Sequence, residues 1–139
     1  MSLDVRDVLA PGAAAAPARI RPPLAPDVVF HSPVADYRGR DDVAHLFAKI
    51  GQCLTGLEPL GQFTDPGAGG EERHGVSTFT AKVGDESVFG ALVQHVDAQG
   101  QLTEATLLLR PLSALTNAVD RMRDALSADP LPSRRRTPQ

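Results

Sequence analysis

The sequence is poor in cysteine and in aromatic residues. Cys53 is the only cysteine among 139 residues, so the chain can form neither an internal disulfide nor a cysteine-cluster metal site. It has no tryptophan, and aromatic residues make up only 4% of the chain, so valine, leucine and alanine must fill most of a core. We expect Cys53 to behave as a small buried hydrophobic residue rather than as a nucleophile.

The chain also lacks an excess of positive charge and a long apolar run. Its 14 basic and 17 acidic residues give a net charge of −3, which offers no broad field for phosphates, so a nucleic acid partner is not expected. No run approaches the roughly 20 apolar residues that cross a bilayer. The alanines at 13–16 are too few, and too close to prolines, for the core of a signal peptide. We therefore expect a cytoplasmic protein with no membrane association.

Metal and phosphate-binding motifs are missing as well. His31, His45, His74 and His95 never occur at helical i, i+4 spacing, and a metal site needs three or four convergent ligands. The glycine-rich segment 66–70 opens no helix and carries no lysine at phosphate-loop spacing, so it is interpreted as a hairpin loop. The sequence predicts no metal and no other cofactor.

What is present fits one domain, because a chain of roughly 100 to 200 residues usually folds around a single core. Residues 1–23 are rich in proline and alanine, and only residues 3–10 leave room for a helical turn or two. Residues 24–126 carry the periodic patterns of a folded domain. Residues 127–139 hold three prolines and the triple arginine Arg134–Arg136, and we expect them to form a disordered basic tail.

Two amphipathic helices are expected within this domain. The first begins near Asp41 and ends before Gly56, and its apolar positions recur with helical spacing, which leaves His45 in solvent. Those positions are Val43, Leu46, Phe47, Ile50 and Leu54. The second helix follows Pro111 and carries a similar apolar stripe of Leu112, Leu115, Val119, Met122 and Leu126.

The remaining pattern is that of an antiparallel sheet. A short strand at 27–31 is ended by Ser32-Pro33. Four extended segments follow the first helix, at 57–64, 73–83, 87–96 and 101–110, and are separated by glycine-rich or aspartate-rich turns. Consecutive segments of this kind indicate hairpins, and hence a meander.

The turn of the last hairpin sets its register. Asp97–Gly100 suits a three-residue loop with a left-handed glycine, so that Asp97 opposes Gln101. Continued evenly, this register pairs Val93 with Ala105, Ala91 with Leu107 and Phe89 with Leu109 on one apolar face, with His95 beside Thr103. Leu92, Gln94, Glu104 and Thr106 fall on the other face. His95 and Glu104 therefore should not meet, although a second bulge in the strand would reverse the faces beyond it.

The order of strand, helix and four-stranded meander resembles the nuclear transport factor 2-like superfamily, and within it the SnoaL-like group. The resemblance is carried by residues 27–33 (DVVFHSP), 37–43 (YRGRDDV), 96–102 (VDAQGQL) and 107–115 (LLLRPLSAL). It implies an α+β fold in which a curved antiparallel sheet wraps around helices to form a cone with an apolar pocket. Relatives usually begin with a helix that closes the mouth of the cone. Here either the C-terminal helix replaces it or the pocket is more open.

The resemblance also bears on catalysis. Ketosteroid isomerases of this superfamily have an aspartate directly before the proline that follows the first strand, where this chain has Ser32, and their second acid falls near Leu92. Members that resemble limonene epoxide hydrolase need an Arg-x-Asp that the meander lacks. SnoaL-like cyclases use an acid near a histidine, for which Glu104 and His95 are the nearest equivalents. The superfamily hosts many functions, so the fold does not decide among them.

These observations favour a domain that binds a small apolar ligand in the cone pocket. The candidate pocket residues are Phe30, His31, Tyr37, Phe47, Phe63, Phe79, Phe89 and His95. One alternative is an enzyme of polyketide-cyclase, isomerase or epoxide-hydrolase type that uses a pocket histidine. The other is a homodimeric interaction domain that pairs through the sheet face bearing Leu92, Leu102, Thr106 and Leu108.

Overall fold

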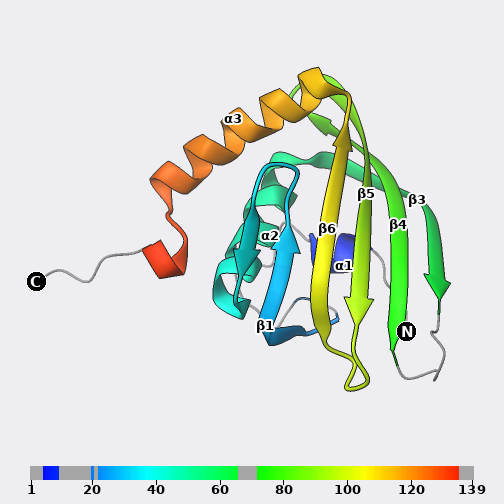
Figure 1. Cartoon of the computed structure of the whole chain (residues 1–139). Helices are drawn as coiled ribbons and strands as arrows, with labels where there is room; N and C mark the ends of the chain where they lie inside the picture. Colours follow the sequence, from blue (N-terminus) through cyan, green and yellow to red (C-terminus); the bar gives the residue numbers. More distant parts are fainter. Residues whose placement is uncertain (1–4, 10–19, 21, 66–71, 135–139) are drawn as a thin grey trace, which may run out of the picture.

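A curved six-stranded sheet forms the centre of the molecule (Figure 1). The computed structural model describes residues 5–9, 20, 22–65 and 72–134. The strands are β1 (Leu24–His31), β2 (Asp36–Arg38), β3 (Thr55–Asp65), β4 (Arg73–Val83), β5 (Glu86–Val96) and β6 (Leu102–Arg110). Their order across the sheet is β2-β1-β6-β5-β4-β3, with β1 parallel to β6 and every other pair antiparallel. The predicted α+β fold and its four-stranded meander are confirmed.

The helices are α1 (Val5–Val8), α2 (Arg40–Cys53) and α3 (Leu112–Ala128), followed by a short 3-10 turn, η3 (Pro132–Arg134). The second helix, α2, packs against β1 and α3, and α1 packs against β3 and β4. Figure 1 shows α3 extending away from the end of β6 and over α2. None of the helices in the described part of the chain is long and apolar enough to cross a membrane.

The core lies between α2 and the concave face of the sheet. The apolar stripe predicted for α2 is buried, and Phe47 meets the ring of Phe30 edge to face at 4.9 Å between centroids. Gly90 on β5 pairs with Phe79 on β4 and leaves room for the phenylalanine ring, because a β-carbon at position 90 would overlap that ring. Burying a side chain of this size stabilises a fold by about 1.5–3 kcal/mol.

The last hairpin begins as predicted and then departs from prediction. Gly100 has a left-handed φ of 79°, and Asp97 N–H donates to the Gln101 carbonyl at 2.9 Å. One residue further along, however, Val96 pairs with Leu102 while His95 pairs with Glu104. Thr103 is thus an extra residue, and its hydroxyl donates to the His95 carbonyl at 3.1 Å.

This second bulge makes the predicted pairs wrong beyond Thr103, and with them the predicted faces of β5. Val93 lies opposite Thr106, Ala91 opposite Leu108 and Phe89 opposite Arg110. These residues form the outer, convex face of the sheet, while Leu92, Ala105 and Leu107 are buried on the concave face. His95 and Glu104 are direct neighbours on the outer face instead of lying on opposite faces.

Two further predictions fail where the segment after α3 packs against α2. His45 is 2% exposed rather than solvated, because its Nε2 lies 2.8 Å from the Asp129 carbonyl oxygen. The segment 127–134 is not a disordered tail, since Leu131 is buried and Ser133 N–H donates to Asp42 Oδ1 at 2.9 Å. The first residues also join the core through buried Val5, Val8, Leu9 and Ile20. The rest of the basic tail, 135–139, lies outside the described residues.

Candidate functional site

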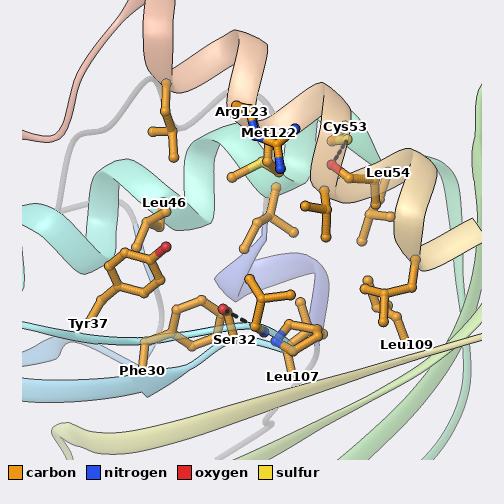
Figure 2. Close-up of a pocket in the computed structure, with 17 residues that line it drawn as sticks. Phe30, Ser32, Tyr37, Leu46, Cys53, Leu54, Leu107, Leu109, Met122 and Arg123 are labelled. Carbon is orange, nitrogen blue, oxygen red and sulfur yellow. Dashed lines mark hydrogen bonds between the residues drawn. The ribbon is translucent and has the colours of Figure 1, made fainter. Parts of the chain in front are cut away.

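A cavity of about 250 Å³ opens beneath α3 (Figure 2). Its walls come from β1 and the turn after it, from β2, from the concave face of β6, and from the facing sides of α2 and α3. The residues that line it are mostly apolar: Phe30, Ser32, Pro33, Val34, Tyr37, Leu46, Ile50, Cys53, Leu54, Leu107, Leu109, Leu115, Ala118, Val119, Met122, Arg123 and Leu126. An apolar hollow with few polar groups is the usual form of a small-molecule site.

The turn between β1 and β2 shapes one wall. The Ser32 hydroxyl donates to the Ala35 carbonyl at 2.8 Å and accepts from the Val34 and Ala35 N–H groups at 3.3 Å and 3.0 Å. Serine side chains commonly stabilise tight turns by such local bonds. The turn brings β2 back against β1, so that Tyr37 pairs with Phe30 and the two rings stack at 6.5 Å. The Ser32 hydroxyl is therefore committed to the backbone.

The last helix forms the roof. Its predicted apolar stripe faces the cavity from Leu115 onward, with Leu115, Val119, Met122 and Leu126 in the lining, whereas Leu112 is 76% exposed. The C-terminal end of α3 is fastened to α2 through Asp129, whose carbonyl oxygen lies 2.8 Å from His45 Nε2 and whose carboxylate contacts Lys49 Nζ at 2.9 Å. This arrangement resolves the alternatives left by the sequence: the C-terminal helix covers the cavity.

Among the polar lining residues, the thiol and the guanidinium differ in exposure. Burial raises the pKa of the Cys53 thiol, an effect that the nearby Arg121 cation partly opposes. The thiol lies 3.9 Å from the Ala118 carbonyl, so it is a neutral wall group and not an activated nucleophile. The Arg123 side chain is 71% exposed at the mouth, with Asp120 Oδ1 at 3.4 Å from its Nη1.

No lining residue in the described part of the chain is a carboxylate or a histidine. General acid–base catalysis needs a titratable group within hydrogen-bond reach of the reacting proton. The described lining offers only a tyrosine hydroxyl, a neutral thiol and an arginine for polar contacts with a ligand. The arrangement suits binding and orientation more than proton transfer.

The predicted pocket residues divide into three groups. Phe30 and Tyr37 line the cavity. Phe47 and Phe79 are fully buried core residues outside its lining. The prediction is wrong for the other four, whose side chains lie on the outer face of the sheet: His31, Phe63, Phe89 and His95. Successive residues of a strand face opposite sides, so Phe30 points inward and His31 outward.

Sequence reasoning missed the largest share of the lining, which comes from β6 and α3. Leu107 and Leu109 were assigned to the correct strand, and Leu115 and Met122 to the correct helix stripe. The helical spacing on α3 was the available signal, because an apolar stripe must face something. Nothing in the spacing indicated that it faces a cavity.

The outer face carries a separate polar cluster. His31 lies between two carboxylates, with Nδ1 at 2.7 Å from Asp36 Oδ1 and Nε2 at 2.6 Å from Glu104 Oε2. The hydrogen bond with Asp36, then that with Glu104, raises the pKa of His31 above its ordinary value. Beside them, His95 Nε2 lies 3.4 Å from Glu72, and its ring is 4.2 Å from that of His74. No metal-binding group of three or more ligands occurs among the described residues.

Solved structures share this architecture, whereas no family model and no curated protein matches the chain. One similar structure is an uncharacterised bacterial protein with a cystatin-like fold from Silicibacter pomeroyi, at 23% identity and TM-score 0.74, covering 90% of this chain and 84% of that one. A steroid delta-isomerase from Pseudomonas aeruginosa matches at 25% identity and TM-score 0.70, covering 76% and 75%. An NTF2-like protein of unknown function from Cytophaga hutchinsonii matches at 12% identity and TM-score 0.53, covering 83% and 97%.

Proposed function

Since the chain has the nuclear transport factor 2-like fold, we propose that it is a binding protein for a compact apolar small molecule, held in the cavity beneath α3. The observation that carries this proposal is the cavity itself, with about 250 Å³ of space and a lining in which most side chains are apolar. An apolar cavity of about 150 Å³ is large enough to hold benzene. The space beneath α3 therefore suits a body somewhat larger than one ring, such as a fused bicyclic system.

The likeness to a steroid delta-isomerase raises an enzyme as the competing function. The position before Pro33 is occupied by Ser32, and its hydroxyl is already engaged by the backbone of the turn. The imidazole of His31 lies on the other side of the sheet, held by Asp36 and Glu104. The proposal therefore includes no pocket histidine. Ligand binding without turnover accounts for the lining residues better than catalysis does.

A second proposal concerns the outer face, which we infer pairs two copies of the chain. Exposed apolar side chains gather there, with Phe63 66% exposed, Leu108 54% and Phe89 39%, and large exposed apolar patches commonly mark interaction sites. The face first expected to pair was partly wrong, since Leu92 and Leu102 are buried on the concave side while Thr106 and Leu108 lie outside.

Charges at the two ends of this face favour a second copy as the partner. Asp65, His74, His95 and Glu104 form a row across one end, next to Glu72. Lys82 and Arg110 lie near the other end and outnumber Glu58, which lies in the same cross-strand row as Arg110. Two copies stacked with their strands running in opposite directions would bring the acidic end of each over the basic end of the other.

Binding in the cavity is tested by filling it. The probe is 2-naphthylmethanol, a neutral bicyclic compound, titrated calorimetrically into the protein. We expect saturable binding to the unaltered chain and at least a tenfold loss in Leu115→Trp, because Leu115 is a half-buried lining residue whose enlargement occupies the space. The matched control is Leu112→Trp, three residues earlier on the same helix and 76% exposed, which should bind as the unaltered chain does.

Each variant is first checked by circular dichroism and thermal unfolding, so that loss of binding is read only from folded protein. If Leu115→Trp does not fold, Leu109→Phe on the opposite wall takes its place. Equal affinity of the unaltered and cavity-filled chains would contradict the proposal, as would the absence of saturable binding to the unaltered chain.

A further inference from the structure

The cavity offers a ligand few polar groups, and one of them is a cation. Of the polar lining residues, Ser32 is used by its turn and Cys53 is a neutral thiol against a carbonyl. That leaves the Tyr37 hydroxyl and the Arg123 guanidinium. No hydrogen bond to the Tyr37 hydroxyl occurs within the part of the chain that the structure describes. Figure 2 shows this hydroxyl on the side of its ring that faces α3, the helix carrying Arg123.

We propose that the natural ligand is an amphipathic acid, with its apolar body between β6, α2 and α3 and its carboxylate or comparable anionic group at Arg123. This inference rests on the proposed binding function and specifies the ligand class. Arginine presents only donors and keeps its charge at all relevant pH values. Its planar fork matches a carboxylate, which can accept two parallel hydrogen bonds.

The sign of the local charge supports an anion over a cation. Arg123 is the single charged residue in the lining as far as the structure describes it. Arg121, on the same helix, acts electrostatically on Cys53 in the cavity wall. Arg121 lies outside the lining, as does Asp120, so the charge that a ligand meets in the lining is that of Arg123. This cation would repel a ligand amine, and a neutral ligand would leave it with Asp120 as its partner.

The solvent exposure of Arg123 limits its contribution to ligand affinity. The Arg123 side chain is 71% exposed and forms an ion pair with Asp120 at 3.4 Å. Charge pairs this open to solvent contribute little and are screened by salt. The apolar body must therefore provide most of the affinity, with Arg123 providing the choice between ligands of the same shape.

Three probes with one bicyclic body separate shape from charge: 2-naphthoate, 2-naphthylmethanol and 2-naphthylmethylamine. In low-salt calorimetric titrations we expect 2-naphthoate to bind most tightly and the amine least tightly. Arg123→Gln should weaken 2-naphthoate binding by about two- to fivefold and leave the alcohol unchanged. Arg123→Lys, which keeps the charge, should recover part of the loss. The matched control is Arg110→Gln on the outer face, which should change neither affinity.

The outcomes distinguish the two levels of the claim. If the alcohol binds but 2-naphthoate binds no more tightly and Arg123→Gln changes neither, the acid preference is overturned and the binding function stands. If Arg110→Gln weakens 2-naphthoate as much as Arg123→Gln does, the effect is long-range charge and the assignment to Arg123 is overturned. If none of the three probes binds the unaltered chain, both the inference and the binding function fail.

Discussion

Along β1, adjacent residues serve opposite sides of the sheet. Phe30 is fully buried and lines the cavity, while the next side chain, His31, lies outside among carboxylates. The strand was predicted from its β-rich composition, but composition does not state which parity faces inward. A histidine at a strand end was a reasonable pocket candidate by analogy, and it is excluded because Phe30 faces inward and successive side chains of a strand alternate.

His45 shows a different limit at the same scale. Its place off the apolar stripe of α2 was predicted correctly, and solvent exposure followed from that stripe. The structure covers this flank with the segment after α3, so that His45 Nε2 meets the Asp129 carbonyl 84 positions later in the chain. Helical spacing reports which face is apolar. It contains no information on a distant polar partner.

The environment of His31 gives a pH-dependent prediction. Both ring nitrogens face carboxylates, which favours the protonated ring and raises the pKa of His31 above 6.5. Because the folded pKa is the higher one, this cluster adds to the free energy of unfolding below about pH 6.5 and loses that contribution as pH rises through the raised pKa. We expect the NMR titration of His31 to show a midpoint above 6.5, and Glu104→Gln to lower it.

A neighbouring carboxylate gives the control. Glu72 contacts His95 on the same face, so Glu72→Gln should leave the His31 midpoint in place. A His31 midpoint at or below 6.5 in the unaltered chain would contradict this description of the cluster. The free energy of unfolding should also differ more between the unaltered chain and Glu104→Gln near pH 6 than near pH 9.

At the scale of elements, the sequence predicted both long helices and the meander because their periodicities are long and clear. The turn at Asp97–Gly100 was also predicted correctly, since aspartate and glycine have specific roles in it. The bulge at Thr103 was not predicted, because any residue that favours β-strands can occupy such a position. One extra residue then reversed the faces of β5 relative to β6, so that Leu92 and not Val93 reaches the core, while Leu107 lies on the apolar face as predicted.

The exchanged faces lead to a prediction about association. Leu108 is 54% exposed on the outer face, where it pairs with Ala91, so Leu108→Glu should place a charge inside the proposed pairing surface and convert dimer to monomer. Sedimentation velocity over a range of protein concentrations measures this. The control is Leu112→Glu, since Leu112 is 76% exposed on α3 and should leave the association state unchanged. An unaltered chain that remains monomeric at high concentration would contradict the pairing.

At the scale of the whole molecule, the resemblance to nuclear transport factor 2-like proteins predicted the fold correctly, and the solved structures confirm it. The order of strand, helix and meander was sufficient for that conclusion. The sequence could not decide whether the C-terminal helix covers the cavity, because this depends on how Asp129 joins the end of α3 to His45 and Lys49 of α2. Those contacts join residues that no local pattern relates.

The central claim is that the space beneath α3 receives a ligand, and methyl NMR tests it most directly. With leucine, valine and methionine methyl groups labelled, 2-naphthylmethanol is titrated into the unaltered chain. We predict saturable shifts in the methyl signals of Leu107, Leu115 and Met122, which line the cavity, with Leu60 and Leu108 outside it unmoved. Shifts confined to Leu60 and Leu108, or no shifts in the cavity, would contradict the claim.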